Sequence, residues 1–275
     1  MERFENKVVY LTGAATGIGE ATAKRMASEG ASLYIVDVDK SELGKTAQEC
    51  RRLGANVESE VCDVSDEASL SRCLLEVRAR CPINGVVHSA GVIRDALVRG
   101  GAAADKSEAV WSSKARSALL LHKLTRDDPI DLFVVFSSIT SAIGNPGQTA
   151  YGAANSYLDR LMSLRSRAGL PGCSVQWPAI SGVGMAVGTV EAGHMGDLSV
   201  DDYMLPPAGV QDVLTRLVVS HNASVSPVVL VSRATHFSHL DARDLQHQFA
   251  QVQHGIQTRE AEEAKRSGVQ SRPKS

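Results

Sequence analysis

Four polar side chains in the second half of the chain have the types and spacing needed for acid–base chemistry. Tyr151 and Asn155 are four residues apart, so they share one face of a helix. Ser138 ends an apolar run thirteen residues before Tyr151 and would face the same cleft. A tyrosine can protonate an oxygen atom, but its free pKa of about 10 requires a nearby cation if it is to ionise at neutral pH. Asn155 cannot supply that charge, and Lys114 on the preceding helix is the best candidate.

Each of these residues also has a structural explanation when it is taken alone. A serine at a strand end often caps a helix, a helical tyrosine often belongs to a core or an interface, and a lysine is usually solvated. The joint spacing favours the chemical interpretation.

A glycine-rich segment near the N-terminus has the composition of a phosphate-binding turn. It runs from Thr12 to Gly19, between the first expected strand and the first expected helix. Backbone N–H groups of such a turn can approach a pyrophosphate, whose charge then lies at the helix N-terminus. Any tight strand-to-helix turn also needs glycine, so the surrounding pattern decides. The contacts expected here come from Gly13, Thr16, Gly17, Ile18 and Gly19.

Other residues would complete a nucleotide site at the carboxyl ends of the strands, where parallel sheets bind ligands. Asp37 ends the second strand, 18 residues after Gly19. Its carboxylate could accept hydrogen bonds from ribose hydroxyls, and it would repel a 2′-phosphate. The remaining contacts expected at strand ends are Asp63, Val64, Ser89, Ala90, Gly91 and Pro178.

Short apolar runs alternate with longer helical stretches along most of the chain. The expected strands are 7–12, 32–37, 57–62, 85–88, 131–136, 173–177 and 227–231. The expected helices are 17–29, 41–53, 66–80, 105–124, 149–168 and 207–220. This alternation predicts an α/β fold: a Rossmann-like, doubly wound parallel sheet of about seven strands in a single domain over residues 1–232.

Two segments lie outside this rhythm. Residues 182–207 contain five glycines and three methionines without a strand pattern, and we expect them to form a substrate lid. Residues 233–275 form a C-terminal tail with one amphipathic helix, followed by a stretch whose composition favours disorder.

Composition and charge argue against several kinds of binding partner. The 275 residues carry a formal net charge of -2, so no basic excess favours nucleic acid. No apolar run is long enough to cross a bilayer, and the charged N-terminus does not resemble a secretory leader. The five cysteines include no Cys-x-x-Cys pair, which favours reduced thiols over a metal site. We expect a cytoplasmic protein with no metal and with no nucleic-acid or membrane partner.

The glycine turn, Asp63–Val64 and the pair of Ser138 and Tyr151 resemble the short-chain dehydrogenase/reductase superfamily. Within it, residues 84–186 resemble the ketoreductase domains of polyketide synthases. The matching stretches are GVVHSAGVIRD at 85–95, FVVFSS at 133–138, GNPGQTAYGAANSYLD at 144–159 and GMA at 184–186. In these domains the lysine and asparagine positions are exchanged relative to the wider superfamily. The resemblance therefore implies NAD(P)H as cofactor and a catalytic tetrad of Lys114, Ser138, Tyr151 and Asn155.

The first 64 residues depart from the ketoreductase pattern. Such domains usually carry a basic segment after the second strand, which binds the phosphate of NADPH. This chain has Val36-Asp37-Val38-Asp39 there, and Lys40 is the nearest cation. We therefore expect NADH to be favoured by Asp37.

The combined interpretation is an oxidoreductase that reduces a β-ketoacyl thioester of polyketide or fatty-acid type to the β-hydroxyacyl product, with tyrosine as proton donor. An acyl carrier protein would hold the substrate, and the resemblance implies a homodimer or homotetramer. One alternative is an NAD-dependent alcohol or polyol dehydrogenase. Another is a nucleotide-sensing or scaffold protein without turnover.

Overall fold

The computed structural model describes residues 3–96, 103–145, 147–180, 205, 209–210, 213–214 and 228–231. The chain divides into two units, Met1–Val231 and Ser232–Ser275. The second unit, which holds the expected tail, lies outside the described residues, as do most of the expected lid and most of the expected helix over 207–220.

Seven parallel strands form one sheet in the order β3-β2-β1-β4-β5-β6-β7. The strand order reverses between β1 and β4, so a crevice is expected outside the carboxyl ends of these two strands. The sheet confirms the predicted doubly wound α/β fold. The strands are β1 (Val8–Thr12), β2 (Ser32–Asp37), β3 (Val57–Val61), β4 (Gly85–His88), β5 (Leu132–Ser138), β6 (Cys173–Trp177) and β7 (Val228–Leu230).

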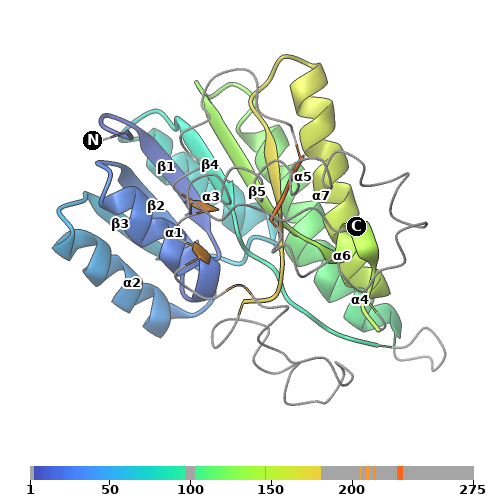
Figure 1. Cartoon of the computed structure of the whole chain (residues 1–275). Helices are drawn as coiled ribbons and strands as arrows, with labels where there is room; N and C mark the ends of the chain where they lie inside the picture. The colour runs from blue at the N-terminus through green and yellow to red at the C-terminus, as the bar shows by residue number, and fades with distance from the viewer. Residues whose placement is uncertain are drawn as a thin grey trace, which may run out of the picture. The chain divides into compact units, whose positions relative to one another are not determined.

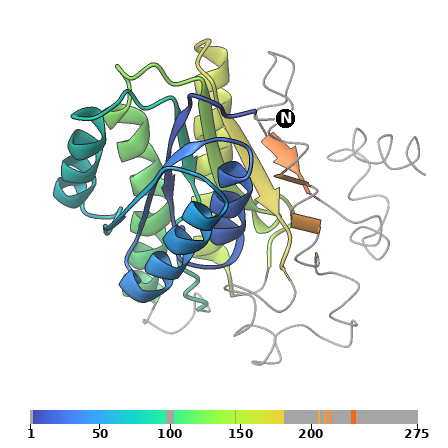
Figure 2. The ribbon, with the colours of Figure 1, turned by 90° about the vertical axis from the view of Figure 1, so that its left-hand side faces the viewer.

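Helices cover both faces of the sheet, as Figures 1 and 2 show. Alternate residues of β1 explain why, since successive side chains of a strand point to opposite faces. Val9 and Leu11 pack in one core with α1 and α2, whereas Tyr10 packs in a second core with α3, α5 and α7. The helices are α1 (Gly17–Ala27), α2 (Lys40–Arg52), α3 (Glu67–Arg78), α4 (Ala103–Trp111), α5 (Ser117–Leu124), α6 (Thr140–Ile143) and α7 (Thr149–Arg167).

The largest departure from the predicted elements lies between β4 and β5. One continuous helix was expected over 105–124, but a π-helical turn, η1 (Ser112–Arg116), separates α4 from α5. A π-helical turn inserts one residue into a helix, and the apolar positions of this segment did not indicate the insertion. The short helix α6 after β5 was also not predicted.

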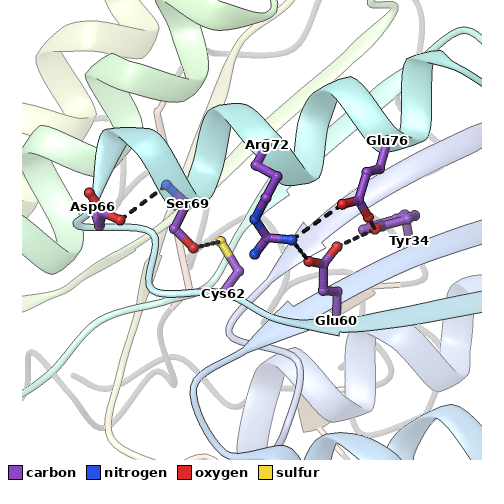
Figure 3. Close-up of polar contacts among 7 residues, drawn as sticks. All are labelled: Tyr34, Glu60, Cys62, Asp66, Ser69, Arg72 and Glu76. Atoms are coloured by element: carbon purple, nitrogen blue, oxygen red, sulfur yellow. Dashed lines mark hydrogen bonds and ion pairs between the residues drawn. The ribbon is translucent and has the colours of Figure 1, made fainter.

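The edge strand β3 carries three polar residues, and side chains from neighbouring elements contact it (Figure 3). Glu60 forms an ion pair with Arg72 of α3 and accepts a hydrogen bond of 2.6 Å from the Tyr34 hydroxyl. Cys62 Sγ accepts a hydrogen bond from Ser69 Oγ at 3.6 Å. All five cysteines are free thiols. No helix in the described ranges is long and apolar enough to cross a membrane.

Candidate active site

The glycine turn packs directly against the end of β4. Gly13 has a φ of +69°, and a Cβ atom built on it would lie 2.4 Å from the backbone nitrogen of Ala90. A Cβ atom on Gly19 would lie 1.9 Å from the carbonyl oxygen of Gly13. Both positions therefore require glycine, and the turn rests on the Ser89–Ala90 backbone.

The N-terminus of α1 is open to a ligand. Thr16 is the N-cap residue, it is exposed, and its side chain makes no capping hydrogen bond. Gly17 and Ile18 follow in the first turn, where backbone N–H groups lack partners within the helix. This end of α1 could therefore accept an anion.

Asp37 forms a hydrogen bond with the glycine turn, although it lies 22 residues after Ala15 in the sequence. Its Oδ2 accepts a hydrogen bond from Ala15 N at 3.0 Å, and its Oδ1 accepts one from Asp39 N at 3.1 Å. A carboxylate oxygen can accept more than one hydrogen bond, so each atom keeps acceptor capacity. Asp37 therefore lies beside the glycine turn, and its expected contact with a ribose stays a prediction.

The other expected cofactor residues lie at the carboxyl ends of their strands. Asp63 follows β3 and is exposed, and its Oδ1 accepts hydrogen bonds from Ser65 N at 2.9 Å and Ser65 Oγ at 2.7 Å. Val64 is buried behind it. Pro178 is buried directly after β6.

The π-helical turn carries Lys114 into the protein. Its side chain is only 2% exposed, and Nζ donates a hydrogen bond to Phe136 O at 3.0 Å. A Cβ atom on Gly91 would lie 2.8 Å from Lys114 Cγ, so Gly91 leaves the room that the lysine stem occupies. Burial lowers the pKa of Lys114 to about 8, and the Asp159 carboxylate opposes this.

Tyr151 is buried beside this lysine. Lys114 Nζ lies 5.3 Å from the centroid of the Tyr151 ring. Burial raises the pKa of Tyr151, and the side chains of Asn155 and Ser138 oppose the increase. Burial therefore sets the direction of the shift, and the expected lowering of this pKa by Lys114 stays a prediction. The phenol stays protonated at neutral pH.

Three buried oxygen atoms around these residues have no hydrogen-bond partner in the described part of the chain: Asp95 Oδ1, Thr140 Oγ1 and Asn155 Oδ1. Buried acceptors are rarely left unpaired, so they suit a water molecule or a polar ligand. Asp95 and Thr140 were not among the site residues expected from the sequence. Thr140 could have been noticed because it follows Ser138 by two residues.

Asp159 of α7 accepts several hydrogen bonds, and it was also not among the residues expected from the sequence. It accepts hydrogen bonds from Ser141 Oγ at 2.7 Å, from Ser174 Oγ at 2.6 Å and from Gln176 Nε2 at 2.7 Å. These bonds tie α7 to β6 and to the turn after Ser138. Asp159 follows Asn155 by four residues, a spacing that could have identified it.

Comparisons with known proteins identify the family of the chain. The KR domain family matches residues 8–182. Mycoketide-CoA synthase of Mycobacterium tuberculosis is 32% identical over 195 residues, which cover 69% of this chain and 5% of that protein. The spectinabilin polyketide synthase system protein NorB of Streptomyces orinoci is 33% identical over 192 residues, which cover 67% of this chain and 9% of that protein. The chain thus spans less than a tenth of either synthase.

Solved structures give the same result. A-type ketoreductases from a modular polyketide synthase match with a TM-score of 0.70 at 30% identity, over 82% of this chain and 46% of that chain. Levodione reductase matches with a TM-score of 0.75 over 86% of this chain and 100% of that chain, and its 23% identity carries the fold alone. The chain therefore belongs to the KR domain family, whose members are NAD(P)-dependent oxidoreductases of C=O and CH–OH groups.

Proposed function

We propose that this chain reduces the β-carbonyl of a β-ketoacyl thioester to a hydroxyl group. One observation carries the proposal: the three residues Ser89–Gly91 touch both halves of the site. Their backbone packs under Gly13 of the nucleotide turn, and Gly91 packs against the stem of Lys114. A dinucleotide held at the turn would therefore end close to the buried lysine and tyrosine.

The residues of the turn fit a nicotinamide dinucleotide. Gly13 and Gly19 leave no room for side chains, the N-terminus of α1 has no side-chain cap, and the Asp37 carboxylate keeps acceptor capacity beside the turn. When bound, NAD(P)H supplies the hydride. Gly13, Thr16, Gly17, Ile18 and Gly19 would hold its pyrophosphate, and Asp37 its ribose.

The proton comes from Tyr151. Its raised pKa keeps the phenol protonated, as reduction of a carbonyl requires. Ser138 would donate a hydrogen bond to the substrate oxygen and polarise the carbonyl. Lys114 would stabilise the phenolate that remains after proton transfer, since its ammonium lies over the same ring. The unpaired Asn155 Oδ1 would hold a water molecule that returns a proton to Tyr151.

The charge of Asp37 favours NADH in this proposal. A 2′-phosphate would meet the carboxylate at the ribose position, and like charges a few ångströms apart repel each other in a partly desolvated cleft. An acyl carrier protein is the proposed source of the thioester, because matched relatives include polyketide synthases.

The position of Asp37 also favours a second candidate. An NAD-dependent alcohol or polyol dehydrogenase would use the same residues in the oxidative direction, with Tyr151 taking up the proton. Its substrate would lack the thioester.

A spectrophotometric assay separates the candidates. NADH and NADPH oxidation are followed with a β-ketoacyl thioester and with a simple bicyclic ketone, and NAD⁺ reduction with a set of alcohols and polyols. The proposal predicts the highest kcat/KM for the thioester. Turnover of alcohols or polyols alone would favour the dehydrogenase. NADH binding without turnover of any substrate would favour a sensor.

A further inference from the structure

A buried histidine connects the nucleotide turn with the π-helical turn. His88 ends β4, and only 1% of its surface is exposed. Its Nδ1 lies 2.8 Å from Thr12 Oγ1, at the end of β1 directly before Gly13. Its Nε2 lies 3.1 Å from Lys114 O and 2.9 Å from Ser117 Oγ. One imidazole ring thus contacts both halves of the site.

The neighbouring atoms determine which ring nitrogen carries the proton. Burial and the charge of Lys114 lower the pKa of His88 to about 3, so the ring is neutral. The Lys114 carbonyl can only accept a hydrogen bond, so Nε2 is the protonated atom. Nδ1 then accepts from the Thr12 hydroxyl, whose oxygen accepts a hydrogen bond from Ala90 N at 3.4 Å.

The π-helical turn needs side-chain hydrogen bonds because one carbonyl group in it lacks its usual backbone donor. The N–H of Ser117 donates to Ser112 O and Lys114 O, so Ser113 O lacks this donor. The Ser117 hydroxyl replaces it, with a hydrogen bond of 2.7 Å to Ser113 O. The Nε2–H group of the His88 ring in turn donates a hydrogen bond to the carbonyl oxygen of Lys114. Side chains thus stabilise a backbone conformation that is otherwise rare.

We propose that His88 is a positioning residue for the reaction. Together with Thr12 and Ser117, it holds the π-helical turn so that the Lys114 ammonium remains over the Tyr151 ring, next to the nucleotide turn. His88 acts through the backbone of Lys114 and needs no contact with substrate. The inference rests on the proposed function and adds a residue to which no catalytic role had been given.

Two measurements test the contacts without activity. Long-range ¹H–¹⁵N spectra of the wild-type protein should show the proton of His88 on Nε2. Hydrogen–deuterium exchange of a peptide over residues 108–120 should be faster in His88→Phe than in the wild type. A proton on Nδ1, or unchanged exchange in this peptide, would overturn the proposal.

Three substitutions at His88 then divide its hydrogen bonds. His88→Phe removes all the hydrogen bonds of the ring, and we expect kcat to fall about 100-fold, the size expected when a catalytic group is misplaced, with little change in KM. His88→Gln keeps an amide N–H near the position of Nε2 and should recover part of kcat. His88→Asn reaches only toward Thr12 and should recover none.

A control and a second readout keep the test decisive. Thr125→Val removes a buried hydroxyl directly after α5, the helix that follows the π-helical turn, where it donates to Leu121 O, and should lower stability without lowering kcat. Loss of kcat in this control, or equal kcat for Gln, Asn and Phe at position 88, would contradict positioning by His88. If His88→Phe fails to fold, the kcat of His88→Gln and the wild-type spectra still test whether His88 positions Lys114. If the wild type reduces no carbonyl compound, the proposed function fails, and the spectra and exchange rates still test the contacts of His88.

Discussion

The two halves of the site are held by different kinds of contact. In the nucleotide half, from β1 to α3, exposed carboxylates bind groups close in sequence: Asp39 and Asp66 cap α2 and α3 through backbone N–H groups, and Asp63 bonds to Ser65. Asp37 and Glu60 differ, because Asp37 also bonds to Ala15, and Glu60 bonds to Tyr34 and Arg72.

In the catalytic half, from β4 to α7, charged and polar groups are buried and their partners are distant in sequence. Lys114 donates to a carbonyl of β5, and no carboxylate in the described part of the chain forms an ion pair with it. Asn155 Oδ1 is buried without a partner in that part. The comparison indicates that hydrogen bonds of exposed carboxylates stabilise the nucleotide half. In the catalytic half, burial of the reacting groups lowers the stability of the folded state.

Tyr151→Phe should separate the two halves most strongly. The substitution removes only the proton donor, and general acids contribute about 10²–10⁴-fold to rate. We expect kcat to fall by that factor while the Kd for NADH is unchanged. Tyr157→Phe, at a half-buried position of the same helix that contacts Trp111, is the matched control and should keep full activity. More than a tenth of the wild-type rate in Tyr151→Phe would exclude this tyrosine as donor.

Lys114→Met should lower activity and raise stability together. Native Lys114 has a pKa of about 8 against an ordinary 10.5, so its charge at pH 7 costs up to about 3 kcal/mol of folding free energy. We expect about 100-fold lower kcat, on the scale of acid–base groups. In urea titrations at pH 7 the variant should be more stable than the wild type.

The pKa of Lys114 also predicts how the stability difference between the wild type and Lys114→Met changes with pH. Between pH 8 and 10.5 the unfolded chain binds a proton at this lysine that the native state lacks, so wild-type stability rises there relative to the variant. Wild-type kcat should fall as the pH rises through about 8, since the ammonium loses its charge, and Lys114→Met should lack this limb. The exposed Lys123→Met should change neither property. A stability difference that is the same at pH 7 and pH 10 would contradict a buried charge.

Gly91→Ala tests the contact between the halves. The new Cβ atom would lie 2.8 Å from Lys114 Cγ and 3.2 Å from Nζ, so the lysine must move by a few tenths of an ångström or more. A smaller displacement than a full ångström suggests about a tenfold loss of kcat. Gly44→Ala in α2 is the control, because nothing lies within 4 Å of its Cβ position. Full activity in Gly91→Ala would show that the lysine is not tightly confined.

Cofactor preference should change by a similarly small factor, without loss of the reaction itself. Asp37→Ser with Val38→Arg removes the carboxylate and adds a guanidinium at an exposed position. The ratio of kcat/KM for NADPH to that for NADH should increase about tenfold, or 1.4 kcal/mol. Asp39→Ser keeps an N-cap residue for α2 and should leave the ratio unchanged. A wild type that already prefers NADPH by tenfold would mean that Asp37 does not face the ribose.

The same contrast explains what the sequence could predict. The ends of β2, β4 and β6 match the expected ranges because apolar strands between polar turns are encoded locally. The π-helical turn at Lys114 escaped prediction because its cause lies 26 residues earlier, in His88, and in Ser117 beside it. The raised pKa of Tyr151 escaped for a similar reason: burial depends on the packing of several elements, and no spacing of charged residues reveals it.

Transfer of a labelled hydride tests the central claim most directly. The wild-type protein is given NADH carrying deuterium at the transferred position of C4, together with a β-ketoacyl thioester, and the product is analysed by mass spectrometry and NMR. We predict a β-hydroxyacyl thioester with one deuterium atom on the β-carbon, and the same experiment with Tyr151→Phe should give almost none. A wild-type product without deuterium at that carbon, or no product while NADH binds, would contradict the account.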